Sequence, residues 1–262
     1  MTTAGGSGGR RCRVGVQLQP QHTTIGDLRR AWRELDDLGV DSLWVWDHFV
    51  PLYGEPDGAH FEAWSLLGAM AVDTRRATIG TLVSAASYRN ADLLADLART
   101  VDHLADGRLV LGVGAGWAER DHSEYGYPFG SAGARLRDLD AALVRIRRRL
   151  GLLQPPPVGR LPILVGGGGE RVTLRLVAEH ADAWNSSAPL SRWTRQNGVL
   201  DEWCSKVGRE PSAIERTALL PRPPDDAELG QWLDAGAQHL VLTSAHPFPA
   251  EPVARLVAEL TG

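Results

Sequence analysis

Residues 13–49 read RVGVQLQPQHTTIGDLRRAWRELDDLGVDSLWVWDHF, and they contain two short apolar runs on either side of one amphipathic segment. The runs 14–19 and 42–47 are rich in Val, Leu and Trp, which is typical of buried strands. Segment 27–38 has apolar residues at helical spacing and is followed by Gly39, a common helix stop. The residues on its apolar face are Leu28, Ala31, Trp32, Leu35 and Leu38. This order of elements predicts a βαβ unit with parallel strands.

The same alternation continues to the end of the chain. Six further apolar runs are found at 77–84, 108–113, 162–165, 182–186, 215–220 and 239–243. Helical patterns lie between them at 90–104, 135–150 and 171–181. In the first of these helices we expect Leu93, Leu94, Leu97, Val101 and Leu104 on the buried side. Eight strand signals with intervening helices predict an α/β fold, a (β/α)8 TIM barrel, whereas a doubly wound sheet usually has fewer strands.

Composition excludes several classes of protein. The chain has 262 residues, 28 basic and 32 acidic side chains and a net charge of −4, which favours neither nucleic acid nor an anionic membrane as a partner. We expect a disordered Gly/Ser-rich tail over 1–11 and one domain over 12–262. No stretch has the length of a signal peptide core or a membrane span. The two cysteines, Cys12 and Cys204, form no paired motif, which favours a reducing, cytoplasmic setting.

In a TIM barrel the chemistry gathers where strands end, so the residues after each run are the candidates. Asp47 and His48 follow the second run directly. Histidine titrates near neutral pH, and a neighbouring carboxylate can orient its ring or bind a heterocycle, so this pair is suited to proton transfer. The alternative is that Asp47 caps a turn and His48 packs in the core.

Two glycine-rich segments follow the fourth and fifth runs. The fourth ends in Gly-Val-Gly-Ala-Gly-Trp over 112–117, where a ligand could approach the backbone closely. The alternative there is a set of small residues that fill the barrel. The fifth ends in four glycines at 166–169 before a helical pattern, with Arg171 beside them. Backbone donors at a helix N-terminus favour phosphate, although the segment is not a P-loop because it lacks Lys-Ser/Thr. A loop without a ligand is the alternative.

Other catalytic patterns are missing from the sequence. The remaining histidines have no metal-ligand spacing, and no Gly-x-Ser-x-Gly is present for a serine nucleophile. We therefore expect no metal site.

Taken together, the motifs resemble the bacterial luciferase-like monooxygenase superfamily, and most closely its branch that uses the deazaflavin coenzyme F420. The segments that carry the resemblance are 46–49, 79–83, 88–90, 107–117, 162–170 and 181–185, with Arg120, Gly126, Pro128, Phe129 and Arg135. The resemblance covers nearly the whole chain from Arg13. It implies a TIM barrel that often dimerises, with the ring of the cofactor at the C-terminal ends of the strands and its phosphate tail on the glycine-rich loops.

The resemblance also implies roles for individual residues. His48 and Asp47 match the pair that meets the deazaflavin, with His48 in proton transfer. Val83 and Ser84 match the bulge that backs the ring. The full set implied to bind the cofactor is Asp47, His48, Val83, Ser84, Ala85, Ala115, Gly116, Trp117, Arg120, Gly167, Gly168, Gly169, Arg171 and Val172. The sequence does not fix which residues form the wall of the substrate pocket. The candidates are Gln17, Gln19, Trp117 and Ser187.

Two departures from the family pattern bear on function. Trp117 stands where the glucose-6-phosphate dehydrogenases of the family carry a catalytic glutamate, which argues against that activity. The insertion that helps cover the site in the family is shortened here to 151–161. The resemblance implies an oxidoreductase that transfers hydride between F420 and a small organic substrate, acting as a homodimer. The alternatives are an FMN-dependent monooxygenase and a barrel that binds a deazaflavin without turnover.

Overall fold

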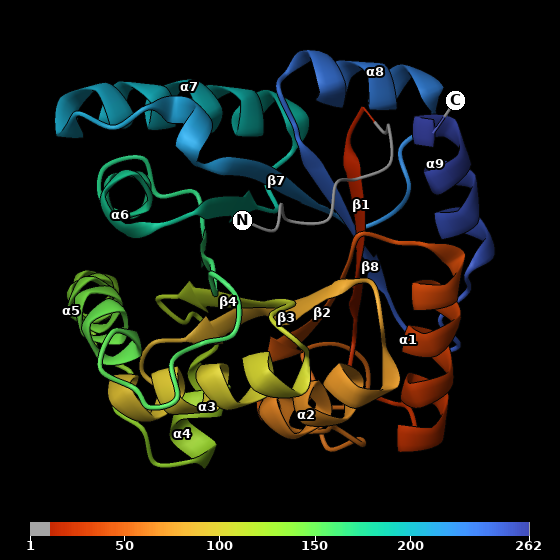
Figure 1. The fold of residues 1–262 in the computed structure, drawn as a ribbon, viewed down its shortest axis with the longest axis horizontal. Helices are drawn as coiled ribbons and strands as arrows, with labels where there is room; N and C mark the ends of the chain where they lie inside the picture. Colours follow the sequence, from red (N-terminus) through yellow and green to blue (C-terminus); the bar gives the residue numbers. More distant parts are fainter. Residues whose placement is uncertain (1–10, 262) are drawn as a thin grey trace.

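The computed structural model describes residues 11–261, which form a closed barrel of parallel strands surrounded by helices (Figure 1). The strands pair in sequence order from β1 to β8, and β8 pairs with β1 to close the barrel. The expected TIM barrel is therefore confirmed. The disordered tail was expected over 1–11, and residues 1–10 of it lie outside the described part of the chain.

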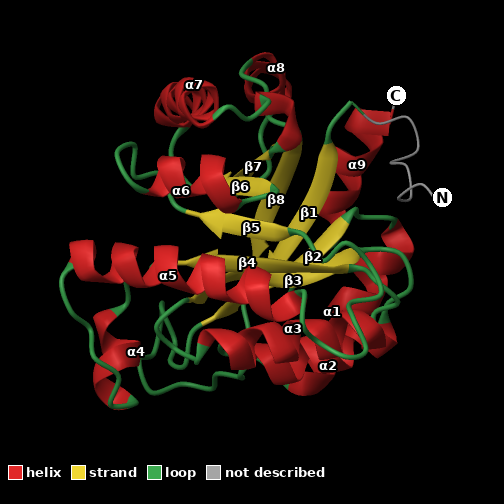
Figure 2. Ribbon diagram, turned by 60° about the vertical axis from the view of Figure 1, so that its left-hand side comes forward, coloured by secondary structure: helices red, strands yellow, loops and turns green. Residues whose placement is uncertain are grey.

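All eight strands lie within two residues of the positions expected from the sequence. They are β1 (Arg13–Leu18), β2 (Ser42–Asp47), β3 (Thr78–Ala85), β4 (Leu109–Gly114), β5 (Ile163–Gly166), β6 (Ala183–Ser186), β7 (Glu215–Leu220) and β8 (His239–Ser244). The helices cover the outside of this barrel (Figure 2). They are α1 (Ile25–Leu38), α2 (Ala63–Asp73), α3 (Ala91–Leu104), α4 (Glu119–Glu124), α5 (Ala132–Leu150), α6 (Thr173–His180), α7 (Leu190–Val207), α8 (Asp226–Asp234) and α9 (Glu251–Thr261), with a 3-10 turn η1 (Pro211–Ala213).

Helix α1 shows how the sequence sets an element. Thr24 caps its N-terminus by accepting a hydrogen bond from the N–H of Asp27, and Gly39 ends it in the left-handed conformation, with φ 89°. The Trp32 ring is fully buried against the barrel, and its Nε1 donates to Asp73 on α2 at 2.9 Å. The apolar face expected for this helix is thus the face that packs.

Helix α3 departs from the expectation. Leu94 and Val101 are buried as expected, but Leu93 and Leu104 are 53% and 47% exposed. The buried face is instead completed by small residues, Ala95 and Ala98, and by Asp102. Asp102 accepts hydrogen bonds from the N–H groups of residues 158 and 159, so the helix turns a carboxylate inward to hold a loop. The spacing of apolar residues alone does not show that this helix must place a carboxylate toward a loop.

The inside of the barrel carries a buried polar layer near the N-terminal ends of the strands. Trp44 Nε1 donates to Ser42 Oγ at 2.6 Å, and Ser42 Oγ lies 2.8 Å from His239 Nε2. Gly15 makes room for this layer, since a Cβ on it would lie 2.2 Å from Ser42 Oγ. Among the described residues, no helix is both long enough and apolar enough to cross a membrane.

Candidate active site

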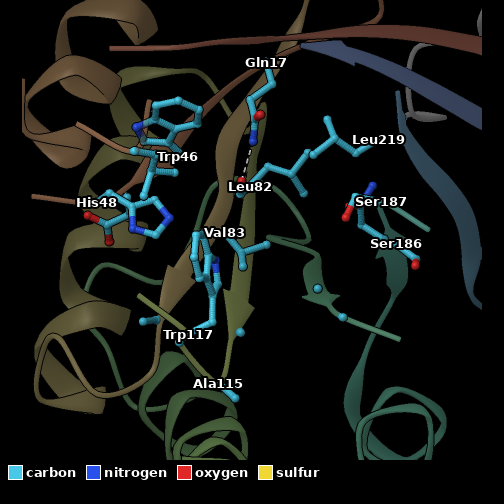
Figure 3. A pocket seen from close by; sticks show the side chains of 18 of the residues that line it. Gln17, Trp46, His48, Leu82, Val83, Ala115, Trp117, Ser186, Ser187 and Leu219 are labelled. Carbon is cyan, nitrogen blue, oxygen red and sulfur yellow. Dashed lines mark hydrogen bonds between the residues drawn. The ribbon is translucent and has the colours of Figure 1, made fainter. Parts of the chain in front are cut away.

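A pocket of about 790 Å³ opens at the C-terminal ends of the strands, where ligands bind in barrels of this kind (Figure 3). Its walls come from the ends of all eight strands and the loops after them. The lining residues are Gln17, Gln19, Trp46, Asp47, His48, Leu52, Tyr53, Leu82, Val83, Ala85, Tyr88, Gly114, Ala115, Gly116, Trp117, Gly166, Gly167, Gly168, Thr173, Asn185, Ser186, Ser187, Leu219, Pro221 and Thr243.

His48 lies at the edge of this pocket and is paired with a buried carboxylate. Its Nδ1 is 2.5 Å from Oδ2 of Asp121, which lies on α4 and 73 residues away in the sequence. Asp121 also accepts hydrogen bonds from the N–H groups of Phe49 and Val50, and from the hydroxyl of Tyr88 at 2.7 Å. These contacts fix both the carboxylate and the loop that carries His48.

The charge of Asp121 sets the tautomer of the imidazole. Burial acts to raise the pKa of the Asp121 carboxyl, but the hydrogen bonds from His48, Phe49 and Tyr88 outweigh it and lower the pKa. Burial, with the charge of Asp121, raises the pKa of Tyr88, so its hydroxyl stays protonated and donates. An ionised carboxylate only accepts hydrogen bonds, so Nδ1 of His48 carries a proton. Nε2 forms no hydrogen bond to any residue from 11 to 261 and is left for a ligand.

Asp47 directly precedes His48 in the chain, but its carboxylate is not the partner of the His48 imidazole. Both of its oxygens accept hydrogen bonds from Arg89, at 2.5 and 3.1 Å, and Arg89 also donates to Glu62 at 2.7 Å. Asp47 is fully buried, and burial raises the pKa of its carboxyl while Arg89 acts in the opposite direction. The orienting carboxylate is therefore Asp121, and Asp47 is held by a bidentate ion pair.

Aromatic rings flank the imidazole of His48 on two sides (Figure 3). The ring centroid of Trp46 lies 6.1 Å away and that of Trp117 lies 5.7 Å away, both in edge-to-face arrangements. Tyr53 packs against Trp46 at 6.2 Å. Trp46 is buried, whereas Trp117 and Tyr53 are 65% and 62% exposed.

The glycine-rich loops form another part of the pocket. A Cβ on Gly114 or Gly166 would lie 2.8 Å or 3.0 Å from the Val83 side chain, so these glycines let Val83 sit between β4 and β5. Gly167 has φ +125°, a conformation that favours glycine. The N–H groups of residues 168–172 donate to no atom of the described chain, and they precede helix α6. Unpartnered N–H groups at a helix start are donors of the kind that bind an anion.

Most residues expected to bind the cofactor line this pocket, and five do not. Ser84 is buried behind it, where its hydroxyl accepts from Trp64 Nε1 at 3.2 Å. Arg120 lies outside the lining, where it donates to Asp57, Glu124 and the carbonyl oxygen of Pro56. Three residues of the loop before α6 lie outside the lining, namely Gly169, Arg171 and Val172. The substrate candidates Gln17, Gln19, Trp117 and Ser187 all line it.

The sequence reasoning missed Asp121 and the role of Arg89. Arg89 was within a segment that carried the family resemblance, but nothing in the sequence connected it to Asp47. Asp121 lies in a polar stretch with several charged residues, and only the folded chain shows which of them turns inward. Asp121 is the buried carboxylate of α4, whereas Glu119 and Glu124 on the same helix are exposed.

Comparison with known proteins identifies the family to which the chain belongs. A model of the luciferase-like monooxygenase family matches residues 11–227 of the chain. The chain is a luciferase-like monooxygenase family member. The segments in which the sequence resembled this family lie within the matched region, and they include the strand ends that carry His48 and Trp117.

Named relatives of this luciferase-like protein are oxidoreductases. A phthiodiolone/phenolphthiodiolone dimycocerosates ketoreductase from Mycobacterium tuberculosis strain H37Rv is 29% identical over 236 residues, 73% of this chain and 60% of that protein. An F420-dependent glucose-6-phosphate dehydrogenase from Amycolatopsis mediterranei is 36% identical over 109 residues, 40% of this chain and 32% of that protein. The match to the ketoreductase thus spans little more than half of its length.

Solved structures share the fold of this luciferase-like chain. An F420-dependent secondary alcohol dehydrogenase in complex with an F420-acetone adduct superposes with a TM-score of 0.82 at 17% identity, covering 95% of this chain and 98% of the other. The FMN-bound oxygenating constituent of a 3,6-diketocamphane monooxygenase from Pseudomonas putida gives 0.70 at 13% identity, covering 94% and 96%. At these identities the likeness concerns the fold.

Proposed function

We propose that this protein is an F420-dependent oxidoreductase that transfers hydride between the deazaflavin and a small organic carbonyl or alcohol. The observation that carries the proposal is the His48–Asp121 pair, with one imidazole nitrogen bound to the carboxylate and the other free at the pocket. Reduction of a carbonyl needs a proton as well as a hydride, and this pair is built to handle the proton. The relatives named as a ketoreductase and F420-dependent dehydrogenases support the same reaction class.

The residues present fit such a cofactor. The free N–H groups of residues 168–172 suit the phosphate of its tail, and the positive end of the α6 dipole adds to their effect. Small residues, Ala85, Ala115 and Gly116, line the same pocket as Val83, and their small side chains leave room for a planar ring. Glu170 is the acidic residue in this loop, and its carboxylate pairs with Arg195 away from the pocket lining.

The chain supplies positioning and proton transfer. Reduced F420, when bound, supplies the hydride. In the direction of reduction, the doubly protonated imidazole of His48 would give its Nε2 proton to the carbonyl oxygen. In the direction of oxidation, neutral His48 accepts the alcohol proton at Nε2. Asp121 holds the Nδ1 proton in both directions and stabilises the imidazolium.

Two measurements test this proposal. Fluorescence titration of the purified protein with F420, and separately with FMN, should give micromolar or tighter binding for F420, about −8 kcal/mol. His48→Ala should keep that affinity and reduce turnover of the reduced cofactor at least about a hundredfold. The control is His103→Ala, on the outer surface of α3, with wild-type turnover. Absence of F420 binding, or full activity in His48→Ala, would contradict the proposal.

A further inference from the structure

The pocket lining contains no lysine and no arginine among the described residues. The one carboxylate in it, Asp47, has both oxygens bound by Arg89, which stands outside the lining. Arg135 is also close to the site, but its guanidinium donates to the carbonyl oxygens of Gly116, Phe129 and Gly130. Neither arginine belongs to the lining: Arg89 is paired with Asp47 and Glu62, and Arg135 donates to backbone carbonyl oxygens. A phosphate or carboxylate placed in this pocket would lose its water without gaining a lysine or arginine partner, since His48 is the one described lining residue that carries a positive charge when protonated.

The surface beside His48 is instead aromatic and unusually exposed. Trp117 and Tyr53 leave 65% and 62% of their surface open, although both belong to a cluster of rings around His48 and Trp46. Leu52 and Leu219 extend the apolar lining of the pocket. Large exposed rings next to a pocket mark a place where apolar ligand surface is buried.

We infer that the substrate is a neutral ketone or secondary alcohol with an apolar arm that lies against Trp117 and Tyr53, and that anionic substrates such as sugar phosphates are rejected. The reaction itself rests on the proposed function, whereas the preference for a neutral apolar ligand rests on the lining alone. The two can therefore be tested apart.

The first experiment compares two ligands of equal length, methyl heptyl ketone and the same ketone with a terminal carboxylate in place of its last methyl. Calorimetry measures their binding to the protein without cofactor, and kcat/KM is measured with reduced F420. We expect the neutral ketone to be favoured at least about a hundredfold in kcat/KM. Equal or better use of the carboxylate ligand overturns the inference and leaves the F420 proposal standing. Binding of the neutral ketone without any F420 binding has the opposite meaning: the pocket preference stands and the redox proposal falls.

Variants of Trp117 show whether this ring is responsible. Trp117→Ala should lower kcat/KM for methyl heptyl ketone about tenfold while changing that for acetone little, because acetone has no arm to bury. Trp117→Arg should improve binding and use of the carboxylate ligand by placing a cation at the pocket. Val144→Ala, an exposed apolar residue on α5 and away from the pocket, is the control and keeps both values. An unchanged preference in both Trp117 variants would contradict the assignment.

Discussion

Asp121 joins three parts of the chain at the level of single residues. It accepts hydrogen bonds from His48, from the backbone of Phe49 and Val50, and from Tyr88, while it sits itself on the short helix α4. Hydrogen bonds to a buried carboxylate are stronger than neutral ones, so this residue contributes to stability as well as to orientation. A substitution here therefore needs a measurement that separates the two effects.

Asp121→Asn tests the positioning role. An amide can donate as well as accept, so Nδ1 of His48 loses its obligatory acceptor and the other tautomer becomes populated. We expect kcat to fall at least about a hundredfold with the fold retained. Nitrogen NMR of labelled histidine should show the proton on Nδ1 in the wild type and a shift toward Nε2 in the variant. A loss of activity with the wild-type tautomer would mean that Asp121 acts only through stability.

The structure places His48 at the pocket, and it gives the imidazole a carboxylate partner other than the neighbouring Asp47. His48 could be predicted because it follows an apolar strand directly, where barrel sites are found. Its partner could not, since the neighbour Asp47 is drawn to Arg89 and the contact with Asp121 exists only once β2 and α4 are brought together by the barrel. A contact between two residues that lie 73 positions apart leaves no pattern in the sequence around either of them.

At the level of elements, close approach of strands decides where glycine is required. A Cβ on Gly112 of β4 would lie 1.9 Å from the carbonyl oxygen of Thr81 on β3, and backbone cannot move aside as a side chain can. Gly68 of α2 has nothing within 4 Å of its Cβ position. A side chain is therefore excluded at Gly112 and has room at Gly68, although the sequence alone does not distinguish the two positions.

Gly112→Ala should destabilise the protein by more than about 3 kcal/mol, or prevent it from folding, because β3 and β4 must separate. Gly68→Ala should raise the free energy of unfolding by up to about 1 kcal/mol, because alanine favours a helix interior. Thermal unfolding followed by circular dichroism measures both. A Gly112→Ala protein as stable as the wild type would show that the strands are not packed as described.

The elements themselves were largely predictable for a simple reason. Strands in a barrel are covered on both faces, so each reads as a continuous apolar run bounded by polar or glycine residues. The face of α3 was not predictable in the same way. Leu93 and Leu104 have the right spacing for burial, yet alanines allow a closer approach to the barrel and Asp102 must reach a distant loop.

For the whole molecule, buried histidines make folding sensitive to acid. His239 is 1% exposed inside the barrel, and burial lowers the pKa of its imidazole. Burial, with the charge of His48, lowers the pKa of His60 to about 4. The unfolded chain binds these protons near pH 6.5 and the folded chain does not, so stability is complete above that pH and falls below it. The expected slope is up to about 1.4 kcal/mol per pH unit for each histidine.

Urea unfolding between pH 7 and pH 5 measures this slope. His239→Gln should give a shallower slope than the wild type, even if its stability at pH 7 is lower, because the group that binds the proton on unfolding is gone. The control is His246→Gln, since the side chain of His246 is 43% exposed and is solvated in both states. Equal slopes in all three proteins would show that His239 does not govern the response to acid.

The layer of Ser42, Trp44 and His239 also has a consequence for kinetics. It fills the barrel at the end away from the pocket, so we expect substrate and product to pass at the C-terminal ends of the strands, beside Trp117 and Tyr53. A product with an apolar arm must leave through this opening before the next substrate molecule can bind. For the function proposed above, we expect turnover of long substrates to be limited by product release rather than by chemistry, and to slow as the viscosity of the solvent rises.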